Sequence, residues 1–415
     1  MMHPFTWLFL AFLALGLALR GWLNLRQVRH VRAHRDAVPE PFDEAIPLEQ
    51  HRKAADYTVA KARIGRWDML LGAVVLLGFT LGGGIDAIDA LWQKSGWHPY
   101  LIGAGVIISI MLISSLIELP LSIYSTFGVE QRFGFNRTTP GLFIADLFKG
   151  LLLSLLLGVP LLLATLWFMD ATGKFWWLWV WALWTGFSLF LTWAYPAFIA
   201  PLFNRFSPLA DEALRERIER LLARCGFESS GVFVMDGSRR SAHGNAYFTG
   251  MGRSKRIVFF DTLLEDLSHE EIEAVLAHEL GHFKLRHITR RLVISATVSL
   301  LALALLGWLV DQPWFYAALG ISNPAHHNAL LIFLLVLPVF TWPFTPLSAM
   351  YSRKHEFEAD AFATEHADAR ALETALVSLY RENASTLTPD PLHSAFYDSH
   401  PPAATRIRHL RERHA

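Results

Sequence analysis

The sequence has a single cysteine, Cys225, among 415 residues, so no disulfide bond can form within the chain. A scaffold held together by disulfides is therefore excluded, and Cys225 is expected to be a small buried apolar residue. Net charge is also absent, because 37 basic residues balance 37 acidic ones. No overall positive field suggests nucleic acid as a partner. Charged residues make up only 18% of the chain, against about 25% in soluble domains.

What the chain has instead is a series of long apolar runs. Hydrophobic residues make up 53% of the sequence, and the mean hydropathy is +0.31. Charge-free runs occur at residues 5–19, 69–85, 100–117, 151–169, 175–200, 292–309 and 328–345. A helix needs about 20 mainly apolar residues to cross a bilayer, a length that the first run reaches when residues 20–23 are included. The sequence therefore predicts seven helices that span a lipid bilayer.

Basic residues indicate how these helices are oriented. The first run could instead be a cleaved signal peptide, but no Lys or Arg precedes it and four arginines follow it within residues 26–35. This order favours an uncleaved span with its N-terminus outside. The first connection, residues 26–66, carries nine Lys or Arg, whereas the second, residues 87–99, carries only Lys94. Odd-numbered connections and the C-terminal tail are therefore expected to face the cytoplasm.

An HExxH motif, His278-Glu279-Leu280-Gly281-His282, precedes the sixth apolar run. Residues four apart lie on one face of a helix, so His278 and His282 can offer imidazole nitrogens to one Zn²⁺. Glu279 then flanks the metal and can take a proton from the attacking water. In a chain with 18 histidines the five residues alone are a weak signal, and the case depends on their context.

The segment around the motif, residues 204–287, is the longest soluble stretch. Its pattern predicts a helix over residues 211–225 and strands at 232–235, 245–249 and 256–260. Ser268 and Glu271 form a capping box, which begins a helix that continues through His282.

The expected fold is a mainly α, polytopic membrane protein. It has seven transmembrane helices and a small α+β, zincin-like catalytic part on the cytoplasmic side. The expected regions are spans one to five with their loops (1–203), the soluble catalytic segment (204–287), spans six and seven (288–350), and a cytoplasmic tail with the third metal ligand and substrate-binding residues (351–415).

A catalytic zinc site takes three protein ligands, so the motif needs a third residue. The metzincin solution would place Gly and His where the chain has Leu285 and Ile288, and that class is excluded. On a continuous helix His287 would lie about 140° around the axis from His282. It is therefore expected to be structural or interfacial.

A carboxylate directly after the seventh span is the alternative. Glu356 and Asp360 are four residues apart, so one can bind the metal while the other accepts a hydrogen bond from a ligand imidazole. We expect Glu356 to be the ligand and Glu358 to be solvated. The histidines precede the sixth span and Glu356 follows the seventh. Two crossings return the chain to the same side, so the three residues can meet.

These features resemble the type I CAAX prenyl endopeptidases, integral-membrane zinc metallopeptidases of the a-factor convertase group. The resemblance covers nearly the whole chain. Besides the seven spans it rests on HELGH, SRKHEFEAD at residues 352–360, GNAYFTG at 244–250, PAFIAPLFNRFSPL at 196–209 and SHPPAATRIRHL at 399–410.

The resemblance implies that His278, His282 and Glu356 bind one zinc ion and that Glu279 is the general base. Asp360 would support a ligand or assist as an acid. Members of the family are thought to enclose a large chamber among the seven helices, with the site at its cytoplasmic end. They remove the last three residues of a CAAX peptide after the isoprenylated cysteine, and some make a second cut upstream.

Further candidates complete the expected substrate site. Asn245, Ala246 and Tyr247 could belong to an edge strand that pairs with an extended substrate; an ordinary hairpin strand is the alternative. His400 could donate to the carbonyl oxygen of the substrate. Arg406 could pair with a peptide C-terminal carboxylate. Without the resemblance, both would be read as surface residues.

Two further features, a single residue and a short segment, have no single assigned role. Glu118 lies just beyond the third apolar run, and it either faces a watery interior or is a helix-end carboxylate at the interface. The segment 130–136, EQRFGFN, resembles a family segment to which the sequence assigns no role.

The expected function is that of a zinc-dependent membrane endopeptidase that cuts near the C-terminus of a peptide or protein substrate, isoprenylated at a CAAX sequence. One alternative is a membrane-protein quality-control protease acting on non-prenylated polypeptides. Another, which the intact Glu279 disfavours, is a channel or transporter with a structural metal site. The expected location is the bacterial inner membrane or the eukaryotic endoplasmic reticulum, with the site towards the cytoplasm.

Overall fold

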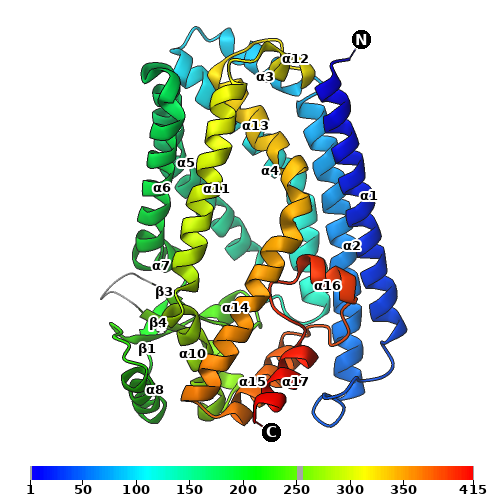
Figure 1. Ribbon diagram of the computed structural model, residues 1–415, viewed down its shortest axis with the longest axis vertical. Helices are drawn as coiled ribbons and strands as arrows, with labels where there is room; N and C mark the ends of the chain where they lie inside the picture. The colour runs from blue at the N-terminus through cyan, green and yellow to red at the C-terminus, as the bar shows by residue number, and fades with distance from the viewer. Residues whose placement is uncertain (1, 250–255, 415) are drawn as a thin grey trace.

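The computed structural model describes residues 2–249 and 256–414. Long helices run roughly parallel to the longest axis of the molecule, and the small sheet lies at one end of them (Figure 1). Six described helices are long and apolar enough to cross a membrane, and a bent helix pair can supply a seventh. The prediction of a polytopic helical protein is confirmed. The long helices are α1 (Pro4–Ala33), α2 (Leu48–Phe79), α4 (Pro99–Ile123), α5 (Pro140–Ala171), α6 (Trp176–Ala194), α11 (His287–Leu309), α13 (His326–Thr341) and α14 (Thr345–His366).

The second span differs from its prediction, because the chain bends where an unbroken run was expected. α2 ends at Phe79, and α3 (Gly84–Gln93) continues at an angle of 50° to it. Gly83, with φ +76°, adopts the left-handed conformation that glycine reaches without strain. A Cβ atom on Gly82 would lie 2.7 Å from the Gly78 carbonyl oxygen. The glycines therefore allow a tight bend inside an apolar sequence.

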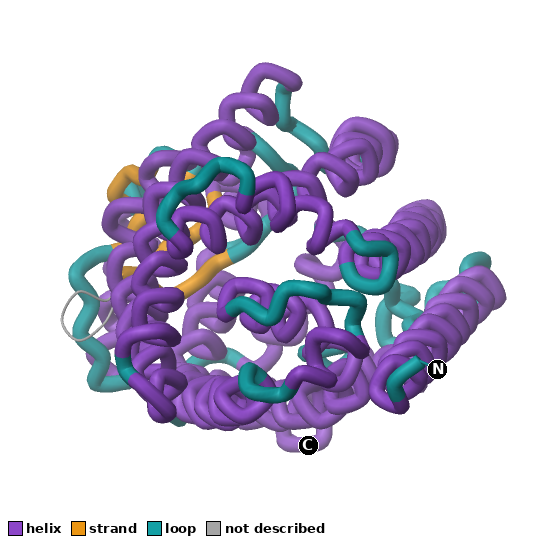
Figure 2. Tube along the Cα trace, turned by 90° about the horizontal axis from the view of Figure 1, so that it is seen from above, coloured by secondary structure: helices purple, strands orange, loops and turns teal. Residues whose placement is uncertain are grey.

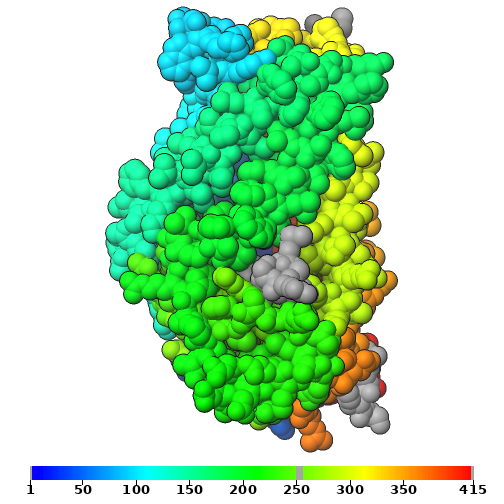
Figure 3. Space-filling view, turned by 90° about the vertical axis from the view of Figure 1, so that its left-hand side faces the viewer, coloured from blue at the N-terminus to red at the C-terminus, as the bar shows by residue number. Residues whose placement is uncertain are grey.

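Two other spans run on beyond their apolar sequence. α4 passes through Pro120 and continues as the π-helix η1 (Tyr124–Glu130). Glu118 is thus not at a helix end; its side chain is exposed, and what it faces stays a prediction. After α6 the chain forms η3 (Tyr195–Ile199) and α7 (Ala200–Phe203). The space-filling view shows α5 and α6 covering the upper part of one face, above the soluble segment (Figure 3).

The soluble segment forms a four-stranded sheet backed by helices. The strands are β1 (Phe206–Pro208), β2 (Val232–Met235), β3 (Ala246–Thr249) and β4 (Arg256–Phe260), in the order β1-β2-β4-β3. Only the β2–β4 pair is parallel. Seen from above, the strands lie to one side of the molecule, away from the N-terminus (Figure 2). Leu221, Phe259 and Leu280 belong to one buried core that joins α8 (Glu212–Arg224), the sheet and α10 (His269–Lys284). Cys225 is buried in this core, as predicted.

The C-terminal region folds back onto α14 as three helices, α15 (Ala369–Glu382), α16 (Pro391–Tyr397) and α17 (Ala403–His414). α16 is held at both ends. At its N-terminus Asp390 accepts from the His393 amide and pairs with Arg26 of α1 through two hydrogen bonds of 3.2 and 2.9 Å. At its C-terminus the Arg353 guanidinium donates to the carbonyls of Ser394, Ala395 and Asp398. These contacts fix the chain that leads to α17.

The contacts of Asp390 predict a stability effect. Asp390→Ala removes the N-terminal cap of α16. It also leaves the His393 amide and the Arg26 guanidinium without the carboxylate that they pair with, whose side chain is only 3% exposed. The free energy of unfolding should fall by about 2–4 kcal/mol. Tryptophan fluorescence during thermal unfolding in detergent would measure it. Asp36→Ala is a matched control, because that carboxylate pairs with arginines at 66% exposure, and its loss should be too small to resolve. Equal stability of both variants would contradict the prediction.

Candidate metal centre

The candidate site lies where α10 crosses α14. The capping box predicted from Ser268 and Glu271 is present and starts α10. At Gly281 the two helices approach so closely that a Cβ atom would lie 3.0 Å from the Ala359 Cα and 3.1 Å from the Phe362 Cβ. Any larger residue would force the helices apart. Because Gly281 stands just before His282, this contact brings the HExxH motif onto the helix that carries Glu356.

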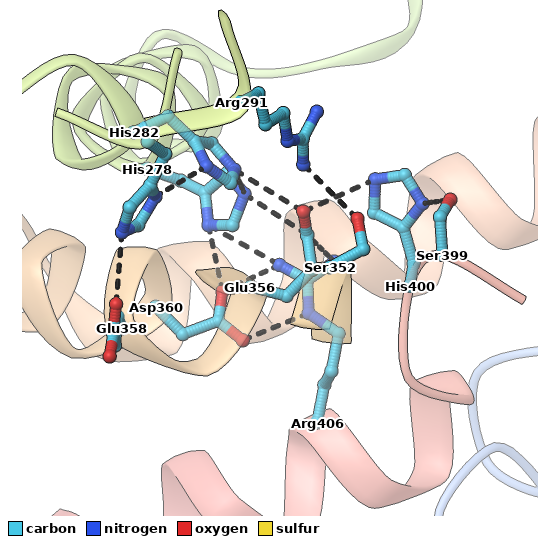
Figure 4. Close-up of polar contacts among 11 residues, drawn as sticks. His278, His282, Arg291, Ser352, Glu356, Glu358, Asp360, Ser399, His400 and Arg406 are labelled. Atoms are coloured by element: carbon cyan, nitrogen blue, oxygen red, sulfur yellow. Dashed lines mark hydrogen bonds and ion pairs between the residues drawn. The ribbon is translucent and has the colours of Figure 1, made fainter. Parts of the chain in front are cut away.

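Three side chains converge at this crossing (Figure 4). His278 Nε2 lies 3.2 Å from His282 Nε2 and 3.4 Å from Glu356 Oε2, and His282 Nε2 lies 3.3 Å from Glu356 Oε1. Ligand atoms bound at about 2.0–2.1 Å to a tetrahedral ion stand about 3.3–3.4 Å apart. Glu356 Oε2 is buried and has no hydrogen-bond partner. The three groups therefore have the spacing, the chemistry and the unsatisfied atom that a metal ion would use.

Asp360 and Arg406 support the first histidine. The Asp360 Oδ1 atom lies 2.8 Å from His278 Nδ1. Burial alone would lower the pKa of His278, but the neighbouring carboxylates of Asp360 and Glu356 raise it to about 9. Arg406 donates from Nε to Asp360 Oδ2 over 2.9 Å and from Nη2 to Oδ1 over 2.5 Å. Asp360 can thus hold the His278 ring so that Nε2 faces His282 and Glu356.

The second histidine has a support that the sequence interpretation missed. His287 Nδ1 lies 3.0 Å from His282 Nδ1, and His287 Nε2 lies 2.9 Å from Glu358 Oε2. The predictions that His287 lies on the wrong side and that Glu358 is simply solvated are both wrong. The His287 prediction assumed a continuous helix, whereas Arg286 (φ 58°) breaks it between α10 and α11. Glu358 is not simply solvated because the displaced His287 ring reaches it. A sequence signal for the end of a helix at residues 284–286 would have been needed to predict these two contacts.

The remaining predicted catalytic residues surround the cluster. Glu279 is half-buried, and no side-chain hydrogen bond or ion pair joins it to another described residue. His400 lies in the loop before α17, with Nε2 3.5 Å from Glu356 Oε1 and Nδ1 3.0 Å from Ser399 Oγ. Its side chain is 62% exposed. It can therefore reach both the cluster and a molecule approaching from solvent.

Arg406 has a different partner from the one expected. Its side chain is 8% exposed, and its guanidinium forms a two-point pair with Asp360, with Nη1 3.8 Å from Glu356 Oε2. A peptide carboxylate would have to compete with Asp360 for the same N–H groups. The tail position of Arg406 was visible in the sequence, but its contact with a residue 46 positions earlier was not.

The candidate substrate strand, β3, lies at the edge of the sheet. The Phe260 amide donates to the Asn245 carbonyl over 2.9 Å, and hydrogen-bonded pairs alternate along an antiparallel ladder. Ala246 and Phe248 therefore direct their backbone groups towards the open edge, whereas Tyr247 pairs with β4. The Asn245 side chain accepts from the Ala246 amide over 2.8 Å. The last residue of the GNAYFTG segment, Gly250, lies outside the described residues.

The segment 130–136 packs beside this strand. Tyr57 of α2 donates to Glu130 Oε1 over 2.7 Å, and His243 Nε2 lies 3.6 Å from Glu130 Oε2. Phe135 stacks on the His243 ring at a centroid distance of 4.2 Å. Asn245, Tyr57 and His243 also line a cavity of about 710 Å³. His243 was missed by the sequence interpretation, although it stands two residues before Asn245.

Comparisons with known proteins cover the whole length of the chain. Residues 27–205 match the family described as CAAX prenyl protease N-terminal, five membrane helices, and residues 208–414 match peptidase family M48. The CAAX prenyl protease 1 homolog of Oryza sativa subsp. japonica is 35% identical, over 99% of this chain and 98% of that protein. CAAX prenyl protease 1 of Saccharomyces cerevisiae is 34% identical, over 94% and 91%. The crystal structure of S. mikatae Ste24p has a TM-score of 0.90 at 30% identity, covering 99% of this chain and 100% of that one.

The contacts of Arg406 predict that its loss unfolds the site. Arg406→Leu would leave Asp360, which is fully buried, without the guanidinium that pairs with both of its carboxylate oxygens. The expected loss is about 3–5 kcal/mol of the free energy of unfolding, because one partner of a buried pair remains charged. Arg411→Ala on the same helix is the control, since Arg411 pairs with Glu373 at 57% exposure. Thermal unfolding of both variants in detergent would measure the effect. A decrease in the free energy of unfolding well below this range for Arg406→Leu would argue against the buried Arg406–Asp360 pair.

Proposed function

The chain belongs to the CAAX prenyl protease group of peptidase family M48, a family of metallopeptidases, and on this basis we propose that it is a zinc-dependent membrane endopeptidase. We further propose that it cuts near the C-terminus of proteins isoprenylated at a CAAX sequence. The observation that carries the proposal is the triangle of His278, His282 and Glu356, whose ligand atoms lie 3.2–3.4 Å apart.

The choice of zinc rests on the donor set. Two neutral imidazoles and one carboxylate, with a further position open, are typical of catalytic zinc and are the set found in thermolysin-type sites. Both rings present Nε2 to the centre, and the Nδ1 atom of His278 contacts Asp360. Such a contact fixes the tautomer that a ligand histidine needs.

The residues of the site have different roles in peptide hydrolysis. A bound zinc ion would supply Lewis acidity, which polarises the scissile carbonyl and acidifies the attacking water. Glu279 takes the proton of that water on its carboxylate and can return it to the leaving amine. His400 donates from its ring to the carbonyl oxygen as negative charge develops there. Asp360, held by Arg406, keeps the His278 ring in place.

The substrate would bind along β3. An extended peptide can add to the open edge through the backbone groups of Ala246 and Phe248, while Asn245 and Tyr247 contribute side chains. The site also lies next to the membrane, because α11, a candidate span, begins five residues after His282. This position suits a substrate that carries its own lipid anchor. The relatives named CAAX prenyl protease 1 support the same substrate class for this chain.

Substitution of Glu279 should separate chemistry from metal binding. Glu279→Gln should retain zinc and lose most activity, since the amide cannot accept the proton; general-base catalysis contributes about 10²–10⁴-fold. Glu356→Ala should lose the metal itself. Cleavage of a farnesylated CAAX peptide and elemental analysis would measure both effects. Glu265→Gln, at an exposed position, is the control and should behave as wild type. Wild-type turnover by Glu279→Gln would refute the assignment of the base.

The same assay tests the substrate class. Wild-type protein should cleave the farnesylated peptide and spare a matched peptide without the lipid, and a chelator should block cleavage. Equal or faster cleavage of non-prenylated polypeptides would favour the quality-control alternative. Absence of chelator-sensitive cleavage of any peptide would argue against a zinc peptidase altogether.

Zinc binding should also release protons. Because the pKa of His278 is raised to about 9, this ring is protonated at pH 7 and must lose a proton when Nε2 binds the ion. About one proton should be released for each zinc ion bound. The apparent affinity for zinc should rise about tenfold per pH unit from pH 7 towards pH 9. Calorimetry in buffers of different ionisation enthalpy measures the proton count. Asp360→Asn should release fewer protons, because the main hydrogen bond that raises the pKa is weakened. A proton count of zero for the wild type would contradict this reading.

A further inference from the structure

His282 is supported by a histidine and a carboxylate from two other helices. His287, the first residue of α11, places Nδ1 3.0 Å from His282 Nδ1. Glu358 of α14 places Oε2 2.9 Å from His287 Nε2. His287 is only 1% exposed. The peptidase mechanism described above makes no use of either His287 or Glu358.

The backbone between the two histidines is unusual. α10 ends at Lys284, and Arg286 has φ 58° and ψ 31°, a left-handed conformation that a non-glycine residue rarely adopts. This single residue turns the chain so that the His287 ring comes back to the His282 ring. On an unbroken helix the two would point about 140° apart. The strained residue thus produces the contact, and strain of this kind is concentrated at functional sites.

The hydrogen positions along this chain of contacts follow from the ligand role of His282. Its Nε2 faces His278 and Glu356, so a neutral ring that binds a metal there carries its hydrogen on Nδ1. That hydrogen can only be donated to the lone pair on His287 Nδ1. A neutral His287 then carries its own hydrogen on Nε2 and donates it to the Glu358 carboxylate. Every donor has an acceptor in this arrangement.

A second metal ion on His287, His355 and Glu358 is the rival reading, since their ligand atoms lie within 4.8 Å of one another. Two observations disfavour it. A metal on His287 Nε2 would leave a hydrogen on Nδ1, facing the hydrogen of His282 Nδ1 at 3.0 Å. The His287 and His355 rings are also stacked 3.9 Å apart with their planes 6° from parallel. An ion bound in the plane of one ring would lie outside the plane of the other.

We propose that His287 and Glu358 are positioning residues that fix the tautomer and ring orientation of His282 and thereby strengthen zinc binding. The inference rests on the proposed function. It gives the two ligand histidines different supports, because His278 is held directly by Asp360 whereas His282 is held through a neutral ring. His355 is 1% exposed, and both of its ring nitrogens are buried without a partner. Its observed contact with His287 is the stacked ring face.

The test is zinc affinity of the full-length protein in detergent, measured by competition with a fluorescent chelator. His287→Leu should weaken zinc binding by about 10–100-fold, the range found for partners of metal ligands. Glu358→Gln, which keeps an acceptor but removes the charge, should weaken it less. The double variant should bind zinc no more weakly than His287→Leu alone, because both residues act through His282.

His355→Phe separates the two readings. It keeps the stacked ring and removes both nitrogens, so positioning by His287 predicts unchanged affinity and one zinc per chain. Loss of a second zinc equivalent in His355→Phe would overturn the inference in favour of a second metal site. If His287→Leu does not fold, as judged by circular dichroism, Glu358→Gln decides the matter, and wild-type affinity in that variant would also overturn it.

Zinc binding by the wild-type protein distinguishes a failure of this inference from a failure of the proposed function. A wild-type protein that binds no zinc would overturn both. A wild-type protein that binds zinc and cleaves its peptide, while His287→Leu retains the same zinc affinity, would overturn the positioning role alone.

Discussion

The close crossing of α10 and α14 at Gly281 is the constraint on which the site depends. Gly281 lies against the backbone of Ala359, and this contact sets the distance between the two histidines and Glu356. Everything around the cluster then supports one helix or the other. Asp360 and Arg406 hold His278, while His287 contacts His282 and is itself paired with Glu358. The pair of helices is therefore better regarded as one preorganised unit than as two ligand-bearing segments.

The membrane part and the soluble part contribute to this unit in different ways. The spans return α14 to the side of the membrane where α10 lies, so residues about 75 positions apart in the chain can meet. The sheet adds an open edge strand beside the cluster, and the C-terminal helices close it from the other side. The contact between Arg26 and Asp390 joins the first helix of the chain to the last region. Both ends of the chain thus contribute to the region around the site.

Sequence reasoning succeeded where a feature is local or periodic. The spans follow from apolar composition, and the four-residue spacings in HExxH and in Glu356–Asp360 follow from helix geometry, so the structure brings these side chains together as expected. It failed where the position of a side chain or helix depends on one backbone angle or on a contact with a residue far away in the sequence. The left-handed Arg286 brings His287 into contact with both His282 and Glu358. The glycines at 82–84 bend the second span, and only the folded tail shows that Arg406 faces Asp360. Such features carry no periodic signal.

The helix that carries Glu356 has one further consequence. From His326 to His366 the chain is almost continuously helical, interrupted only by the short 3₁₀ turn Trp342–Phe344. A change in bilayer thickness alters the tilt of such a helix, and that tilt must be absorbed at the turn or passed on to Glu356. Lipid composition can therefore act mechanically on the position of the Glu356 carboxylate.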